Sequence, residues 1–186
     1  MKNHTRNFYI LIFFTFLSNL SNAQTGTMTQ SVSVNRNQIW SKDLTTGELK
    51  MIGVGCSPKF SPDGKFIMYV GYEIDKKGIT SVGQIGTIWI MSNNGENPKQ
   101  VVPASLGSAS SPCWSPDGKY IIFSLKKKSK KDTDLYTISI QGEDLKQLTT
   151  NTSNDFSPHW TADNYVYFVS DRGSKRGKYQ IWRFKV

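Results

Sequence analysis

The chain has 186 residues and a formal net charge of +9, and hydrophobic residues make up 37% of it. This length suits one domain with a real core. Two cysteines and the single histidine after residue 23, His159, cannot supply the ligands of a structural zinc site with the usual spacings, so no metal or other cofactor is expected. The chain also has no glycine-rich phosphate loop and no G-x-S-x-G nucleophile elbow, which argues against nucleotide binding and serine-peptidase chemistry.

Residues 1–23 are predicted to be a signal peptide. Lys2 and Arg6 precede an apolar run at residues 8–17, and Ala23 closes a small-x-small pattern of the kind that signal peptidases cleave. A membrane span needs about 20 apolar residues, so this shorter run favours a cleaved leader, and no transmembrane span is expected after cleavage. We therefore expect a periplasmic or secreted protein with a net charge of about +7. Nucleic acid is not an expected partner in such a compartment.

Short strands recur along the rest of the chain at a regular spacing. Residues 24–37 form an N-terminal segment with a candidate first strand at 32–34, and the repeats cover residues 38–186. Strands centred on Trp40, Trp89, Tyr136 and Trp182 lie 49, 47 and 46 residues apart. A period near that length, with several short strands in each unit, indicates the blades of a β-propeller or a related array.

The turn Ser-Pro-Asp-Gly occurs at residues 61–64 and again at 115–118. Each copy follows an aromatic residue and precedes a lysine and an apolar run. Proline presets φ, aspartate hydrogen-bonds the backbone and glycine accepts a positive φ, so each copy predicts a hairpin. A degraded copy, Thr-Ala-Asp-Asn, stands at residues 161–164. The three aspartates are expected to form turns and not to act as catalytic acids: Asp63, Asp117 and Asp163.

Each unit divides into four strands, a to d. Strand a carries Phe60, Trp114 or Trp160; strand b is an apolar run at 66–70, 120–123 or 165–169; strand c lies at 88–91, 135–138 or 181–184. Strand d is weaker, as at 145–148. No segment after the leader shows a sustained helical period. The predicted fold class is therefore all-β, a β-propeller-type array of four-stranded antiparallel blades with about three to four blades, including partial terminal ones.

The incomplete terminal blades leave three interpretations open. The chain could be an open four-blade array, half of a dimer that completes a larger ring, or a gene fragment. The exposed flanks of terminal blades predict self-association.

The segment Pro-Cys-Trp-Ser-Pro-Asp-Gly-Lys at residues 112–119, with the strands that follow it, resembles the repeat of TolB-like (WD-repeat-like) β-propeller proteins. The resemblance covers roughly residues 38–186. It implies a propeller that acts as a non-enzymatic protein-protein interaction platform at the cell envelope. TolB-type proteins also carry an α/β domain and six blades, and neither that domain nor six repeats is expected from this sequence. Similar repeats also accompany peptidases and lyases, so one alternative is a remnant of such an enzyme. The other alternative is a carbohydrate-binding propeller module.

The predicted binding surface lies on the loops between strands b and c. In a four-stranded blade these loops and the d–a connections share one end of the sheet, and the a–b and c–d turns share the other. The b–c loops carry a surplus of positive charge, so we expect an acidic envelope protein or an anionic polymer as partner. The alternative is that these lysines are only solvated loop residues. The basic face consists of Lys126, Lys127, Lys128, Lys130, Lys131, Arg172, Lys175, Arg176 and Lys178.

No catalytic residue is predicted. His159 occupies the repeat position of Lys59 and Cys113, which indicates a variable filler position and not a general base. Cys56 and Cys113 stand at different offsets from their Ser-Pro pairs, so we expect two separate small core residues, with a disulfide as the alternative. The carbohydrate-binding alternative depends on two aromatic residues near the b–c loops, Tyr72 and Tyr179.

Overall fold

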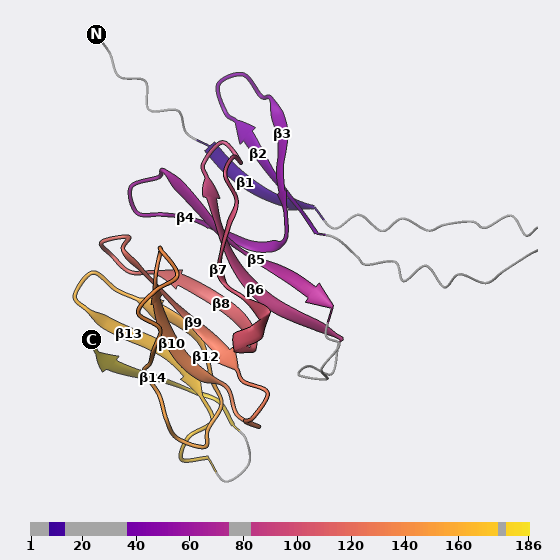
Figure 1. Ribbon diagram of the computed structural model, residues 1–186. Helices are drawn as coiled ribbons and strands as arrows, with labels where there is room; N and C mark the ends of the chain where they lie inside the picture. Colours follow the sequence, from indigo (N-terminus) through magenta and orange to yellow (C-terminus); the bar gives the residue numbers. More distant parts are fainter. Residues whose placement is uncertain (1–7, 14–36, 75–82, 175–177) are drawn as a thin grey trace, which may run out of the picture. The chain divides into compact units, whose positions relative to one another are not determined.

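The computed structural model describes residues 8–13, 37–74, 83–174 and 178–186. The chain divides into two compact units, residues 1–56 and 57–186 (Figure 1). Within the described ranges the regular structure is β-strand apart from one short 3₁₀ turn, η1 (Ala104–Leu106). In the same ranges no helix has the length and apolar character needed to cross a membrane. The all-β prediction is confirmed.

The first unit holds one antiparallel sheet. Its strands β1 (Phe8–Phe13), β2 (Gln38–Asp43) and β3 (Leu49–Val54) pair in the order β1-β2-β3. β2 and β3 match the strands predicted around Trp40. The strand predicted at residues 32–34 lies outside the described residues, and β1 is the strand that pairs with β2. β1 comes from the apolar run assigned to the leader, because such a run suits a strand as well as a signal peptide. Leader cleavage stays a prediction.

The second unit holds three antiparallel sheets built on one plan. In each sheet the strands pair in chain order, which confirms the predicted a-to-d arrangement. The third sheet has three strands in the described chain. The strands are β4 (Cys56–Phe60), β5 (Phe66–Ile74), β6 (Gln84–Ser92) and β7 (Lys99–Val102), then β8 (Ser108–Trp114), β9 (Tyr120–Lys126), β10 (Asp134–Ser139) and β11 (Lys146–Gln147), and finally β12 (Asp155–Trp160), β13 (Tyr165–Ser170) and β14 (Gln180–Lys185).

Two buried apolar clusters join the three sheets face to face (Figure 1). Ile121, Phe123 and Leu125 of β9 pack into the cluster shared with the first of these sheets. Ile122, which points to the other face of the same strand, packs with Val166 of the third sheet. Alternate residues of one strand therefore enter two different cores. This double coverage is why strand b reads as a continuous apolar run and not as an alternating one.

The two Ser-Pro-Asp-Gly turns have the same hydrogen bonds. In the second copy the Ser115 hydroxyl donates to Asp117 Oδ1 at 2.7 Å and accepts from the Tyr120 amide at 2.9 Å. The first copy repeats these contacts at 2.6 and 3.0 Å. Gly118 has a φ of +70°, the left-handed conformation that the motif predicts. In the degraded copy Asn164 takes this role with a φ of +62°.

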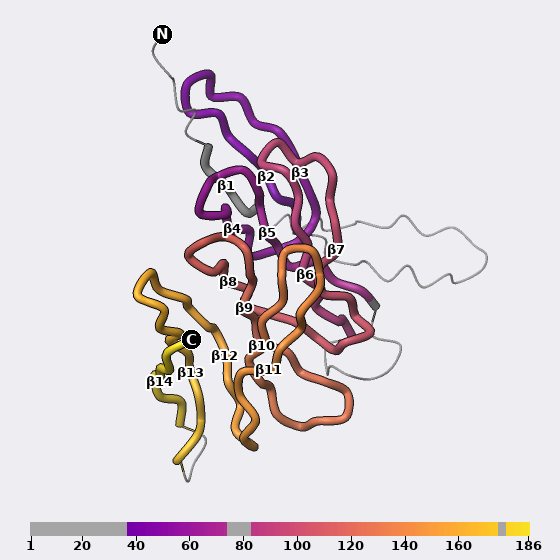
Figure 2. Tube along the Cα trace, turned by 60° about the vertical axis from the view of Figure 1, so that its left-hand side comes forward, coloured from indigo at the N-terminus to yellow at the C-terminus, as the bar shows by residue number. Residues whose placement is uncertain are grey.

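The two ends of each sheet carry different connections, as predicted. At one end the c–d turns contact the a–b turns: the amides of Asn93 and Ile140 donate to the carbonyls of Lys65 and Lys119 at 2.9 and 3.1 Å. The b–c loops and the d–a connections therefore lie at the other end. Figure 2 shows the loop between β9 and β10 and the end of β13 at the same end of the unit.

The first two sheets of the second unit approach each other through their backbones near Gly86. A Cβ atom at this position of β6 would lie 2.0 Å from the carbonyl oxygen of Ala109 in β8. The Gly86 amide donates to the Ser108 hydroxyl at 3.0 Å. Only glycine permits this approach, because any side chain would collide with main-chain atoms that cannot rotate away.

Candidate functional site

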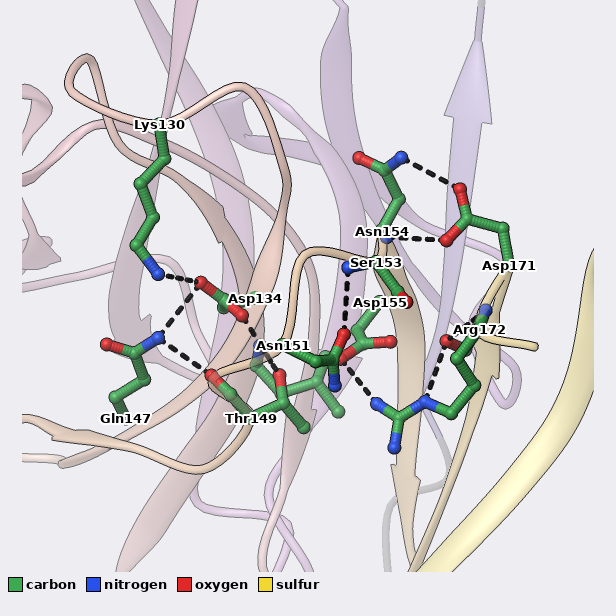
Figure 3. A network of polar contacts seen from close by, with 12 residues as sticks. Lys130, Asp134, Gln147, Thr149, Asn151, Ser153, Asn154, Asp155, Asp171 and Arg172 are labelled. Carbon is green, nitrogen blue, oxygen red and sulfur yellow. Dashed lines mark hydrogen bonds and ion pairs between the residues drawn. The ribbon is translucent and has the colours of Figure 1, made fainter. Parts of the chain in front are cut away.

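Hydrogen bonds through the start of β12 join two b–c loops of the predicted basic face. The Asp155 amide donates to the Thr133 carbonyl at the end of the β9–β10 loop, at 2.8 Å. The Asp155 carboxylate accepts a hydrogen bond from Arg172 Nη2 of the β13–β14 loop at 2.7 Å, and the two side chains form an ion pair. The loops of two neighbouring sheets are therefore held side by side (Figure 3).

Two predicted partner-binding residues form ion pairs within the fold. Arg172 contacts the fully buried Asp155 and stacks 4.7 Å from the ring centroid of Phe168. Lys130 Nζ lies 2.7 Å from Asp134 Oδ2, and this hydrogen bond raises the pKa of the Lys130 ammonium. Gln147 donates to the same carboxylate oxygen at 2.9 Å (Figure 3). Because these contacts neutralise both charges, Lys130 and Arg172 shape the loops and offer little charge to a partner.

Among the described residues of the basic face, most of the exposed cations lie in the β9–β10 region. Lys127 lies over the Tyr136 ring, 4.8 Å from its centroid. Lys175 and Arg176 lie outside the described residues. Among the described residues no carboxylate pairs with the remaining cations, all of which are exposed: Lys126, Lys128, Lys131 and Lys178.

A groove that the sequence analysis missed runs along the three a strands. Ser57, Ser111 and Ser157 have φ values of +52°, +50° and +50°, and each precedes a proline. The strand register shifts at this position in β8 and β12. The three serines, with Lys59 and His159, line a cavity of about 350 Å³. The only signal in the sequence was the Ser-Pro pair at the same offset in all three repeats.

A second cavity, of about 510 Å³, adjoins the first because Lys59 and His159 line both. Its other lining residues include the strand-a aromatics Phe60, Trp114 and Trp160. We call the two cavities together the strand-a groove. The Trp114 indole donates to the Lys59 carbonyl at 3.1 Å, which ties β8 to β4 along the groove wall.

Cys113 and His159 come together in the strand-a groove. Cys113 Sγ lies 3.9 Å from His159 Nδ1, although the two residues are 46 positions apart in the chain. The Cys113 side chain is buried and His159 is exposed. Cys113 forms no disulfide with Cys56, in agreement with the expectation of two separate thiols. Within the described ranges no three histidine, cysteine or acidic residues gather as metal ligands would.

The sequence matches the family model described as the TolB beta propeller domain over residues 48–186. The chain belongs to the TolB β-propeller family. It is 30% identical over 123 residues to the Tol-Pal system protein TolB of Francisella tularensis subsp. mediasiatica, covering 66% of this chain and 26% of that protein. It is 31% identical over 87 residues to dipeptidyl-peptidase 5 of Porphyromonas gingivalis, covering 44% of this chain and 13% of the peptidase.

The TolB-like fold also appears in solved structures. The crystal structure of TolB from Acinetobacter baumannii superimposes with a TM-score of 0.62 at 22% identity, covering 80% of this chain and 35% of that one. This likeness confirms the propeller fold. The chain spans about a quarter or less of the two curated relatives named above, so their activities and partners enter here only as proposals.

Proposed function

We propose that this TolB-like chain is an exported, periplasmic protein that binds other proteins of the cell envelope without catalysing a reaction. The observation that carries the proposal is the set of exposed lysines in and next to the β9–β10 loop: Lys126, Lys128 and Lys131. The ion pair between Lys130 and Asp134 fixes the conformation of this loop. A rigid loop with unpaired cations attracts an acidic surface at little entropic cost. The proposed partner is an acidic envelope protein, with an anionic polymer as the less specific possibility.

Two further observations support this proposal. The relative from Francisella is a Tol-Pal system protein, which agrees with a role at the envelope. The Lys130–Asp134 and Arg172–Asp155 pairs fix both adjoining loops, so the surface keeps its shape when no partner is bound.

Charge reversal tests the proposed surface. The variant Lys126→Glu/Lys128→Glu/Lys131→Glu should lose capture of partners from envelope extracts, and wild-type capture should weaken as salt rises. The matched control reverses three exposed lysines that lie away from the b–c loops: Lys119, Lys146 and Lys185. This control changes the net charge by the same amount and should retain capture. If both triple variants lose capture equally, total charge and not this surface is responsible, and the proposal fails.

Carbohydrate binding is the second candidate function. Tyr72 and Tyr179 are 49% and 56% exposed, and the Tyr179 ring is held edge-on by Phe156 at a centroid distance of 5.8 Å. Exposed, fixed aromatic rings suit stacking on sugars. Binding to a glycan array that depends on Tyr179 and survives the lysine reversals would favour this function over protein binding.

A further inference from the structure

The strand-a groove has a polar end and an apolar end that meet at two basic residues. The three serines in the left-handed conformation surround the smaller cavity, and aromatic side chains surround the larger one. Lys59 and His159 line both cavities and therefore stand where the two meet. Lys59 and His159 come from the first and third of the stacked sheets, with Cys113 of the middle sheet beside His159.

The groove wall is poorly suited to pairing with an added β-strand. Proline follows each of the three left-handed serines, and proline has no amide hydrogen to donate. The register shifts in β8 and β12 further interrupt the edge. A peptide that enters the groove must therefore be recognised mainly by its side chains or by its end, not by a continuous ladder of backbone hydrogen bonds.

The charges around the groove favour an anion. No aspartate or glutamate lines either cavity. The aspartates that follow the lining residues Pro62, Pro116 and Ala162 accept hydroxyl hydrogen bonds within their own turns: Asp63 from Ser61 at 2.6 Å, Asp117 from Ser115 at 2.7 Å and Asp163 from Thr161 at 2.5 Å. The Lys59 ammonium thus has no carboxylate in the groove to neutralise it, and a bound carboxylate would supply one.

The lining of the larger cavity favours a ligand that also carries an apolar group. Phe60 and Trp160 are half-buried, so each leaves part of its ring for a ligand. Pro62 and Pro116 extend the apolar lining toward the a–b turns. A ligand that satisfies the whole groove combines a carboxylate with an apolar side chain next to it, as the last residue of a peptide does.

We propose that the strand-a groove binds the carboxyl terminus of a peptide or protein whose last residue is apolar. The terminal carboxylate lies between Lys59 and His159, and the last side chain packs against Phe60 and Trp160. The basic face and the strand-a groove share no residue, so this proposal does not depend on the lysine cluster of the b–c loop. Failure of one leaves the other intact.

Matched peptides test the inference directly. Acetyl-Ala-Ala-Phe with a free carboxylate should bind the purified chain on the order of tenfold more tightly than the same peptide with a carboxamide end, measured by titration calorimetry. Lys59→Met should remove this difference, and Lys59→Arg should retain it. The control Lys65→Met removes a lysine that contacts Asp63 outside the groove lining and should leave binding unchanged.

The rate of Cys113 alkylation provides an independent measure of whether a peptide occupies the strand-a groove. The bound acid peptide should slow alkylation of Cys113 by iodoacetamide, while Cys56, which does not line the groove, serves as the internal reference by mass spectrometry. Equal affinity for acid and amide peptides, or unchanged binding by Lys59→Met with a native circular-dichroism spectrum, would overturn the inference. Binding of 3-phenylpropionate as tight as that of the peptide would overturn the assignment of a peptide end.

Discussion

Single residues fix the a–b turns, and in both Ser-Pro-Asp-Gly copies the hydroxyl of the first serine makes two hydrogen bonds. Ser115 is buried and uses its hydroxyl twice, as a donor to Asp117 and as an acceptor from the Tyr120 amide. The Lys119 amide adds a second hydrogen bond to Asp117 at 3.0 Å. The turn is therefore closed by side-chain contacts as well as by the Gly118 backbone.

Replacing Ser115 should weaken the protein in a pH-dependent way. Ser115→Ala removes both hydroxyl contacts and should lower the free energy of unfolding by about 1–2 kcal/mol at pH 7. The hydroxyl and the Lys119 amide lower the pKa of Asp117 below 3.8. Stability from this carboxylate is present above the unfolded pKa and is lost as pH falls through the folded pKa.

The difference between wild type and Ser115→Ala should therefore shrink below about pH 4, as measured by urea unfolding across a pH series. Ser110→Ala changes an exposed serine of β8, the strand that leads into this turn, and should have little effect at any pH. A Ser115→Ala deficit that is constant down to pH 2 would show that Asp117 takes no part.

Strands and loops at the end of the sheets that carries the b–c loops are joined by ion pairs that the sequence alone does not reveal. Arg172 and Asp155 are 17 positions apart, and in the sequence analysis Arg172 was assigned to the partner-binding surface and Asp155 was given no role. Nothing in the local pattern distinguishes an arginine that turns inward from one that faces solvent. The structure shows that Asp155 is fully buried, and a buried carboxylate requires a partner.

Removing the Arg172 cation should show how strongly the stability of the fold depends on its ion pair with Asp155. Arg172→Met leaves the fully buried Asp155 without its ion pair and should cost about 3–5 kcal/mol of unfolding free energy. Arg172→Met/Asp155→Asn should recover part of the loss, because the unpaired charge is gone. Chemical denaturation of both variants measures the difference. An Arg172→Met variant as stable as wild type would mean that Arg172 is available to partners after all.

The hairpins were the most predictable part of the fold. The Ser-Pro-Asp-Gly copies located the a–b turns correctly because proline fixes φ and glycine accepts the positive φ that the turn needs. The left-handed Ser57, Ser111 and Ser157 were not foreseen, since serine has no strong preference for that conformation. The strand-a groove was missed for the same reason: it depends on bulges and on contacts between repeats, which local propensities do not encode.

At the scale of the whole molecule, the third sheet of the second unit ends in an accessible strand. In the described chain β14 pairs only with β13, and Ile181 is 78% exposed. An apolar edge of this kind favours pairing with another chain. The predicted self-association therefore has a specific location, and we propose that it proceeds through β14.

Sedimentation velocity over a range of concentrations tests this proposal. The wild-type chain should show species larger than one chain, and Ile181→Lys should shift the distribution toward the monomer because a charge opposes edge pairing. Leu145→Lys adds the same charge at an exposed position just before β11 of another sheet and should not shift the distribution. A wild-type protein that sediments as a monomer at every concentration would contradict the prediction.

The contact between Gly86 and Ala109 affects how the sequences of adjacent β-propeller repeats can change during evolution. Where main-chain atoms of adjacent repeats touch, their spacing is set by groups that every amino acid shares. Apolar residues elsewhere between the same two sheets can then change in size, and the angle from one repeat to the next is retained as long as this single glycine is kept.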